Sequence, residues 1–161
     1  MMIQRKLLSL LEKSRKSFLL LGPRQTGKST LIRQLKPELE INLAEETTYL
    51  DFAKNPGELQ ARLSGRNVST VFIDEVQRIP SILNTIQAML DRNPGKLKFF
   101  LTGSSARKLR RGQANLLPGR IHTYDLGPLS CSELGYACRT TEALETGSLP
   151  GIYVESDPAE R

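Results

Sequence analysis

The sequence has little of what many enzymes use for nucleophilic or metal-assisted chemistry, since its 161 residues include one histidine and two cysteines. The histidine, His122, stands in a stretch that reads as a strand, so a structural role is expected and the residues of acyl-transfer sites are absent. Cys131 and Cys138 have no further cysteine or histidine at a metal-ligand spacing, so we expect buried or idle thiols. Neither an acyl-transfer site nor a zinc site is indicated.

Long hydrophobic runs are also missing. No apolar run approaches the roughly 20 residues that a membrane-spanning helix needs. Residues 1–16 mix leucine with charged side chains at helical spacing and lack the uncharged centre and cleavage site of a secretion signal. The contents of 39% apolar and 25% charged residues are ordinary for a soluble globular protein. We therefore expect a cytoplasmic protein of one main domain, without membrane association.

Acidic residues are absent from residues 92–124, and the basic surplus is unevenly distributed. Residues 1–36 carry nine basic and one acidic side chain, a net charge of +8, and residues 92–124 carry eight basic side chains, again +8. Residues 37–91 and 125–161 each have a net charge of −5, so the total is +6. Both basic blocks contain segments expected around a nucleoside triphosphate, which explains part of the surplus. A nucleic-acid partner is permitted but not required.

The octapeptide from Gly22 to Ser29 is the strongest functional signal, because it fits the phosphate-binding pattern G-x-x-x-x-G-K-[ST]. An apolar run at 18–21 precedes it and a helix-compatible stretch at 29–35 follows, an order that wraps backbone N–H groups around an anion. Lys28 can reach the β- and γ-phosphates, and the Ser29 hydroxyl can bind Mg²⁺. The residues expected to bind the nucleoside triphosphate are Gly22, Pro23, Arg24, Gln25, Thr26, Gly27, Lys28, Ser29 and Thr30.

A second signal is the apolar run at 71–73, which is followed by the adjacent carboxylates Asp74 and Glu75. Asp74 is expected to hold Mg²⁺ together with Ser29. Glu75 is expected to orient or deprotonate the water that attacks the γ-phosphate. Two solvated acids at a strand end would look the same in isolation. Their position 46 residues after Lys28, with one strand and one helix between, favours a catalytic pair, and Glu75 favours a hydrolase over a mere nucleotide binder.

A third signal is the strand-like run at 97–101, which is followed directly by Thr102-Gly103-Ser104. A hydroxyl at this place can contact the γ-phosphate or the attacking water. Thr102 is preferred over Ser104 for this catalytic role, although Thr-Gly-Ser is also a common strand-ending turn.

A fourth signal is the basic stretch that includes Arg107, Lys108 and Arg120. Arg120 follows a Pro-Gly turn and precedes another expected strand. It is therefore the first candidate for an arginine finger supplied to a neighbouring subunit of a homo-oligomer. The alternative for each of these residues is a solvated basic face.

Strand-like and helix-like segments alternate along the chain. Strands are expected at 18–21, 39–43, 68–73, 97–101 and 121–126, and helices at 3–16, 29–35, 51–64, 81–91, 105–112 and 130–137, of which the one at 51–64 is broken early by Pro56-Gly57. This order predicts an α/β fold of three layers with a mainly parallel five-stranded sheet. Residues 1–139 are expected to form this core, with 1–16 as a leading amphipathic helix, and residues 140–161 to form a tail.

Three segments together carry a resemblance to a known family. GPRQTGKSTL, VFIDEVQRIP and FFLTGSSARKLRRGQANLLPGRI, in this order, resemble a group of prokaryotic AAA-type P-loop ATPases in which an ATPase core precedes a C-terminal domain of unknown function. The resemblance implies hydrolysis of the β–γ bond of ATP with Mg²⁺. It also implies that Thr102 occupies the sensor-1 position and that Gln77 helps to orient Glu75 or the γ-phosphate. The tail at 140–161 is then the start of a domain that this chain lacks.

Other P-loop classes fit less well. A GTPase would carry an Asn-Lys-x-Asp loop, which does not occur, and the Leu63-Ser64-Gly65 run lacks the Gly-Gln that would follow it in an ABC transporter. A small-molecule kinase would need an acceptor site and a lid. Two other classes stay open, namely an ATP-gated nucleic-acid-binding module that uses residues 105–112, and a truncated nucleotide binder with little turnover.

Overall fold

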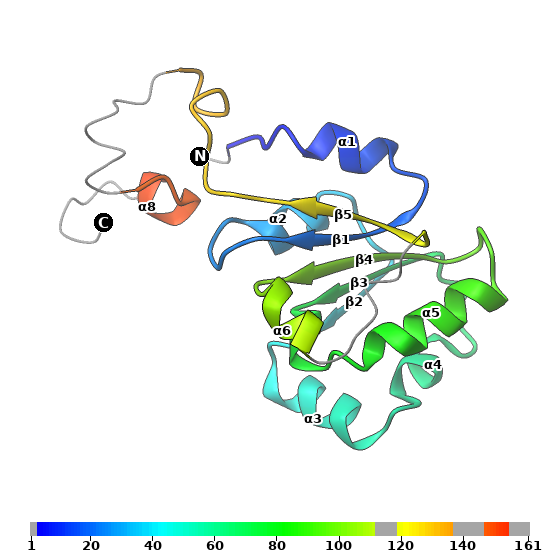
Figure 1. The fold of residues 1–161 in the computed structure, drawn as a ribbon. Coiled ribbons are helices and arrows are strands. Elements are labelled where there is room, and N and C mark those ends of the chain that lie inside the picture. Colours follow the sequence, from blue (N-terminus) through cyan, green and yellow to red (C-terminus); the bar gives the residue numbers. More distant parts are fainter. Residues whose placement is uncertain (1–2, 112–118, 137–146, 155–161) are drawn as a thin grey trace.

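The computed structural model describes residues 3–111, 119–136 and 147–154. Within them, five parallel strands form one sheet in the order β2-β3-β4-β1-β5 (Figure 1). The strands are β1 Ser17–Leu21, β2 Leu39–Asn42, β3 Thr70–Asp74, β4 Lys98–Gly103 and β5 Ile121–Asp125. The predicted α/β fold with a five-stranded parallel sheet is therefore confirmed.

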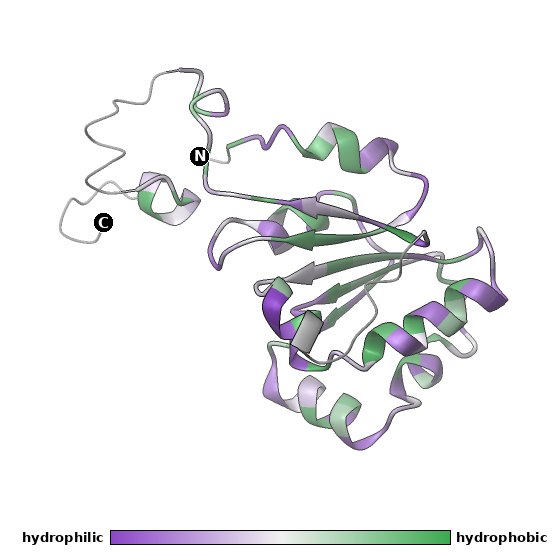
Figure 2. Ribbon diagram, viewed as in Figure 1, coloured by the Kyte–Doolittle hydropathy of each residue, from purple (hydrophilic) through white to green (hydrophobic). Residues whose placement is uncertain are grey.

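Helices cover both faces of this sheet, which gives the predicted three layers. They are α1 Leu8–Lys13, α2 Lys28–Arg33, α3 Glu46–Lys54, α4 Glu58–Leu63, the short 3-10 helix η1 Val76–Arg78, α5 Ile82–Arg92, α6 Ala106–Arg111 and α8 Pro150–Val154. In Figure 1, α1 and α2 lie on one side of the sheet and α3 to α6 lie on the other. Figure 2 shows hydrophobic residues along the strands and on helices that face them, and hydrophilic residues at the outer turns.

Strand β1 shows how one apolar run supplies both cores. All five of its residues are buried. Phe18 and Leu20 belong to the cluster under α1 and α2, whereas Leu19 and Leu21 belong to the cluster under α3 to α6. This division follows because successive side chains of a strand point to opposite faces, and a strand covered on both faces is apolar throughout. The rings of Phe18 and Phe100 stack with centroids 4.9 Å apart and join β1 to β4.

Two expected helices differ from the structure. The helix expected at 51–64 is two helices, α3 and α4, because Asn55-Pro56-Gly57 forms a turn in which the Gly57 amide donates to Asn55 Oδ1 at 2.9 Å. The prediction of a helix at 130–137 is wrong for the described residues, because residues 131–136 form successive turns. Cys131 is exposed and disulfide-bonded, not the buried or idle thiol that was expected.

The direction of the strands decides where a site can form. Because all five strands are parallel, the loops that follow β1, β3 and β4 lie together at one end of the sheet, here called the carboxyl edge. The opposite end, where the strands begin, is called the amino edge. No helix in residues 3–111, 119–136 or 147–154 combines the length and the apolar character needed to cross a membrane.

Candidate active site

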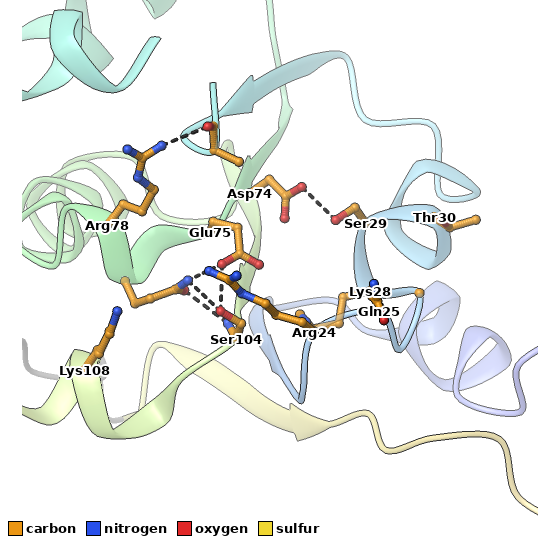
Figure 3. Close-up of a pocket in the computed structure, with 13 residues that line it drawn as sticks. Arg24, Gln25, Lys28, Ser29, Thr30, Asp74, Glu75, Arg78, Ser104 and Lys108 are labelled. Atoms are coloured by element: carbon orange, nitrogen blue, oxygen red, sulfur yellow. Dashed lines mark hydrogen bonds between the residues drawn. The ribbon is translucent and has the colours of Figure 1, made fainter. Parts of the chain in front are cut away.

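A pocket of about 880 Å³ lies at the carboxyl edge, between the loop after β1, the end of β3 and the start of α6 (Figure 3). Its lining consists of Arg24, Gln25, Gly27, Lys28, Ser29, Thr30, Ala44, Asp74, Glu75, Gln77, Arg78, Ser104 and Lys108. Four of these side chains are basic and two are acidic, and this surplus suits a polyphosphate. The volume falls in the range of roughly 300–1,000 Å³ that is common for small-molecule sites.

The loop at 22–27 connects β1 to α2 and forms one wall of the pocket. Gly27 stands directly before α2 in the left-handed conformation, with φ 84°, which glycine adopts without steric cost. The Lys28 ammonium folds back into the loop and donates to the carbonyl oxygens of Gly22 at 3.0 Å and Pro23 at 2.7 Å. The loop therefore already surrounds a cation at the place where phosphates are expected.

The charge of Lys28 is sensitive to its surroundings. Burial lowers the pKa of Lys28, and the nearby Glu75 and Asp74 carboxylates oppose this effect. The guanidinium of Arg24 lowers the pKa further. An anionic ligand in the pocket would favour the charged form of Lys28.

Three residues of the predicted ATP-binding set shape the loop and do not line the pocket. A Cβ at Gly22 would lie 2.1 Å from the carbonyl oxygen of Leu126, so the segment after β5 can approach the loop only because this residue is glycine. The Thr26 hydroxyl, which is buried, donates to the Pro23 carbonyl oxygen at 3.0 Å. The other six residues of the set line the pocket.

The Ser29 hydroxyl donates to Asp74 Oδ2 at 2.7 Å across the pocket. Asp74 ends β3 and is 6% exposed, and its Oδ1 accepts a hydrogen bond from Thr102. Adjacent oxygens around an octahedral Mg²⁺ with bonds of about 2.1 Å lie roughly 2.9 Å apart, so these two donors fit the ion. The described residues hold no group of three or more histidine, cysteine or acidic side chains that could bind a metal. Phosphate oxygens and water would complete the shell, as Mg²⁺ sites often require.

Glu75 follows β3 in the left-handed conformation, with φ 60° and ψ 46°, which is uncommon for a residue other than glycine. Its Oε2 accepts hydrogen bonds from Ser104 Oγ at 2.8 Å and from the Gln77 side-chain amide. Gln77 is buried and also donates to Ser104 Oγ at 2.9 Å. Figure 3 shows the Glu75 and Ser104 side chains facing each other. Backbone strain of this kind is concentrated at functional sites.

The two hydroxyls at the end of β4 have different positions. Thr102 is fully buried, donates to Asp74, and accepts from the Glu75 backbone amide at 3.0 Å. Ser104 lines the pocket and contacts the Glu75 carboxylate. Thr102 is thus placed behind the acidic pair, and Ser104 is the hydroxyl of the two that faces the pocket.

Arg120 lies away from this pocket. It precedes β5 at the amino edge and forms an ion pair with Asp91, in which Nε and Oδ1 are 2.7 Å apart. If Arg120 acts as an arginine finger, it therefore does so in the pocket of another copy of the chain. This role stays a prediction.

Two basic residues of the lining have no assigned role from the sequence. Arg78, in η1, donates through Nη1 to the Leu43 and Ala44 carbonyl oxygens at 2.8 Å each, and its Nη2 pairs with Glu46 at 2.8 Å. It thereby holds the loop after β2 against the pocket. Lys108 reaches the pocket from α6, opposite the phosphate loop (Figure 3). The basic stretch around Lys108 was a signal, but the sequence alone does not select this residue from its neighbours.

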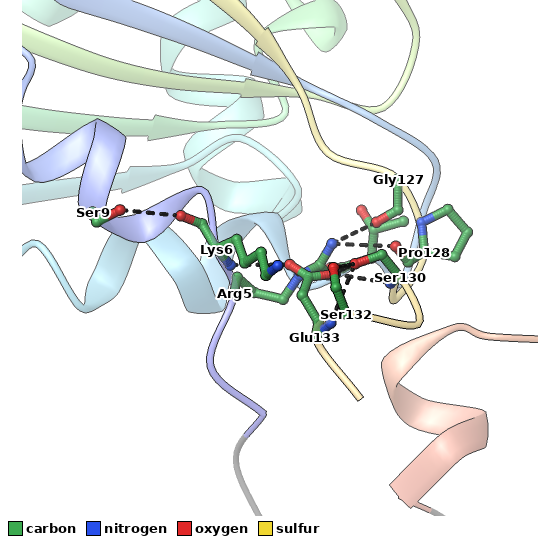
Figure 4. Close-up of polar contacts among 9 residues, drawn as sticks. Arg5, Lys6, Ser9, Gly127, Pro128, Ser130, Ser132 and Glu133 are labelled. Atoms are coloured by element: carbon green, nitrogen blue, oxygen red, sulfur yellow. Dashed lines mark hydrogen bonds and ion pairs between the residues drawn. The ribbon is translucent and has the colours of Figure 1, made fainter. Parts of the chain in front are cut away.

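No sequence pattern distinguishes Arg5, yet it joins the phosphate loop to the segment after β5. Figure 4 shows the Arg5 side chain beside Gly127, Pro128 and Glu133. The Arg5 guanidinium donates to the carbonyl oxygens of Thr26 and Gly127 at 2.8 Å each. It also forms an ion pair with Glu133, with Nε and Oε1 2.9 Å apart and both side chains 7% exposed. In the sequence, an arginine within an amphipathic segment cannot be distinguished from a solvent-exposed one. Only the tertiary structure therefore reveals the supporting role of Arg5.

Comparison with protein families matches residues 14–135 to the AAA domain, and the chain therefore belongs to the AAA domain family. Similar proteins include an uncharacterised protein of Mycobacterium tuberculosis and one of Mycobacterium bovis, each 30% identical over 142 residues, or 86% of this chain and 31% of the relative. The Holliday junction branch migration complex subunit RuvB of Staphylococcus aureus is 35% identical over 98 residues, or 57% of this chain and 27% of RuvB. The chain thus spans about a third or less of the length of these relatives.

Solved structures with a similar fold include PCH-2 of C. elegans and the Pif1 helicase of Candida albicans. PCH-2 has a TM-score of 0.51 and 19% identity, covering 79% of this chain and 41% of PCH-2. The helicase has a TM-score of 0.51 and 16% identity, covering 91% of this chain and 43% of the helicase. At these identities the likeness shows the fold alone.

Proposed function

We propose that this chain binds ATP with Mg²⁺ in the pocket at the carboxyl edge and hydrolyses the β–γ bond of ATP. Membership of the AAA domain family supports nucleotide binding. The observation that carries the proposal is the 2.7 Å contact between Ser29 Oγ and Asp74 Oδ2. It joins the residue after the phosphate-loop lysine to the acid that ends β3, as a shared Mg²⁺ requires.

Each side chain of the pocket has a role in this proposal. The loop amides and Lys28 bind the phosphates, and Mg²⁺, held by Ser29 and Asp74, neutralises charge on the β- and γ-oxygens when it is bound. Glu75 orients a water molecule and accepts its proton as the water oxygen bonds to the γ-phosphorus. The bond between the γ-phosphorus and the bridging oxygen breaks, which leaves ADP and inorganic phosphate. Ser104 contacts the Glu75 carboxylate, and Thr102 holds Asp74 from behind.

Further proposals concern the assembly, the domain organisation and the cellular location of the chain. We assign Arg120 a finger role only toward a neighbouring subunit of a homo-oligomer, because it lies at the amino edge of its own chain. Residues 1–139 are proposed as the ATPase core and 140–161 as the start of a further domain. Use of ATP favours a cytoplasmic location.

A second candidate function, an ATP-gated nucleic-acid-binding module, is supported by the likeness to RuvB, a subunit of a complex that migrates Holliday junctions.

The proposal is tested by phosphate release from ATP and from GTP by the purified chain, with Mg²⁺ and with EDTA. We expect release from ATP that requires Mg²⁺. Glu75→Gln should keep nucleotide affinity and lower turnover by about 10²-fold or more, the usual contribution of a general base. Lys28→Ala should weaken affinity itself. Lys54→Ala, an exposed change at the end of α3, is the control and should alter neither. Unchanged turnover in Glu75→Gln would remove Glu75 from its role.

A further inference from the structure

Each of the five described strands is preceded by a basic side chain at the amino edge. These residues are Lys36 before β2, Arg66 before β3, Lys96 before β4, Arg15 and Lys16 before β1, and Arg120 before β5. Because the strands are parallel, all of them gather at the end of the sheet opposite the pocket. Figure 1 shows the turns that lead into β1 and β4 at this end, and Figure 2 shows hydrophilic residues on both.

The strand register places two of these cations, Lys16 and Arg120, level with each other and with Lys98, the first residue of β4. Ser17 of β1 pairs with Ile121 of β5, and Phe18 pairs with Phe100 of β4, so the preceding Lys16 is level with Arg120 on one side and Lys98 on the other. Neighbouring strands are about 4.8 Å apart. Two contacts confirm that the strand beginnings meet. Lys16 Nζ donates to the Gly119 carbonyl oxygen at 3.4 Å, and Lys98 Nζ donates to the Ser14 carbonyl oxygen.

Nearby acids balance only part of this charge. Asp91 pairs with Arg120, and the exposed Glu38 accepts hydrogen bonds from the Ser69 and Thr70 amides. Exposed basic residues of the edge remain in excess; they are Arg15, Lys16, Lys36, Arg66, Arg92 and Lys96. Within the described part of the chain, none of these six forms an ion pair.

ATP does not account for these residues. The sequence alone suggested that both basic blocks surround the nucleotide. In the structure, the basic residues of the pocket are Arg24, Lys28, Arg78 and Lys108. Apart from Arg66, the cations of the amino edge come from the same two blocks, but they lie at the end of the sheet opposite the pocket, so ATP bound in the pocket does not contact them.

We propose that the amino edge of the sheet binds the phosphate backbone of a nucleic acid. The six exposed cations of the edge suit a polyanion, and contacts to its phosphate backbone need no protein groups other than such basic side chains. An acidic protein is less favoured, because protein interfaces are built around apolar anchors. Large exposed hydrophobics in the described residues are Leu10, Leu50, Tyr136 and Tyr153, none in the turns that lead into the strands. Because the described part of these turns presents no large exposed aromatic side chain to stack on bases, binding should be independent of sequence.

The test uses the 161-residue chain and short fluorescein-labelled oligonucleotides, single-stranded and double-stranded, in fluorescence polarisation across a salt series. A triple variant, Arg15→Gln, Lys16→Gln and Lys96→Gln, should bind about tenfold more weakly or worse. Its slope of log affinity against log salt should shrink by about 2 for a single strand and about 3 for a duplex, since each lost contact removes roughly 0.7 or 0.9. The strand form with the higher affinity identifies the ligand.

The matched control is Lys6→Gln, Arg33→Gln and Lys54→Gln, which removes the same charge from exposed positions that lie outside residues 105–112 and outside the turns that lead into the strands. The control should keep its affinity, and both triple variants should keep the affinity of the chain for ATP, so this inference stands or falls apart from the ATPase proposal. Equal losses in the two variants would assign binding to net charge and overturn the proposal. So would affinity for poly-glutamate but not for either oligonucleotide. If the triple variant does not fold, the single exposed change Lys96→Glu replaces it, with Lys54→Glu as its control.

Discussion

The Arg5 guanidinium donates a hydrogen bond to the carbonyl oxygen of Thr26 at 2.8 Å, inside the phosphate loop. The same guanidinium contacts Gly127 and Glu133, which follow β5. One side chain before α1 therefore joins the loop expected to bind phosphate to the segment that leaves the sheet. This bridge supports the loop from the side opposite to the pocket.

Removal of the Arg5 side chain should destabilise the chain. In Arg5→Ala the Glu133 carboxylate and the carbonyl oxygens of Thr26, Gly127 and Pro128 lose a charged donor, which should lower the free energy of unfolding by about 2–3 kcal/mol. Urea unfolding at neutral pH measures this loss. Lys6→Ala, an exposed neighbour, is the control and should change the free energy by less than about 0.5 kcal/mol. Equal stability of the two variants would show that the bridge contributes nothing.

The same bridge predicts a dependence of stability on pH. Burial alone would raise the pKa of the Glu133 carboxyl, but hydrogen bonds from the Ser130 and Lys6 amides and from Arg5 outweigh it and hold the pKa below the ordinary 4.5. The ionised form is thus favoured in the folded state. Its stabilisation is complete above pH about 4.5 and is lost as the pH falls through the folded pKa.

The measurement for this carboxyl is urea unfolding between neutral and acidic pH. Below pH about 4.5 the free energy of unfolding should fall more steeply for the wild type than for Glu133→Gln, which cannot titrate at this position. Other carboxyls contribute equally to both proteins and cancel in the difference. Parallel pH profiles would contradict the assignment.

Two glycines of the phosphate loop should respond differently to alanine. In Gly22→Ala the new Cβ would meet the Leu126 carbonyl oxygen at 2.1 Å, so we expect a loss of about 3 kcal/mol or more in unfolding free energy. In Gly27→Ala the Cβ has nothing within 4 Å, and only the left-handed backbone opposes it, at about 1–2 kcal/mol. Thermal unfolding ranks the two variants. A milder effect at Gly22 than at Gly27 would show that the close approach is not a constraint.

The two hydroxyls at the end of β4 should separate stability from turnover. Thr102→Val leaves the Glu75 amide and Asp74 without a buried partner, which should cost about 1–3 kcal/mol of unfolding free energy. Ser104→Ala should cost less than about 1 kcal/mol but lower kcat, because the Glu75 carboxylate loses a donor in the pocket. Urea unfolding and phosphate release measure the two effects. A loss of kcat in Ser104→Ala no larger than in the Lys54→Ala control would remove Ser104 from the site.

Local patterns were sufficient for the sheet and for the loop. The apolar runs of β1, β3 and β4 predict buried parallel strands because each is covered on both faces. Five residues of the 22–29 motif line the pocket, namely Arg24, Gln25, Gly27, Lys28 and Ser29. These features depend on residues close together in the chain.

Features that depend on distant residues were not predicted. Arg5 contacts Glu133 across 128 positions, and nothing beside either residue indicates the other. The preference for Thr102 over Ser104 stays a prediction, and the burial of Thr102 and the position of Ser104 in the pocket lining depend on residues distant in the chain. The basic blocks at 1–36 and 92–124 each contain residues of both ends of the sheet, so the charge distribution along the chain does not separate the pocket residues from those of the amino edge.

The central claim is that Ser29 and Asp74 share one Mg²⁺ with the phosphates of ATP. Titration calorimetry of ATP, with Mg²⁺ and with EDTA, tests it most directly in the wild type and in Asp74→Asn, which keeps the shape of the side chain. We predict that Mg²⁺ strengthens ATP binding to the wild type and that Asp74→Asn loses most of this gain. The same Mg²⁺-dependent gain in both proteins would contradict the account.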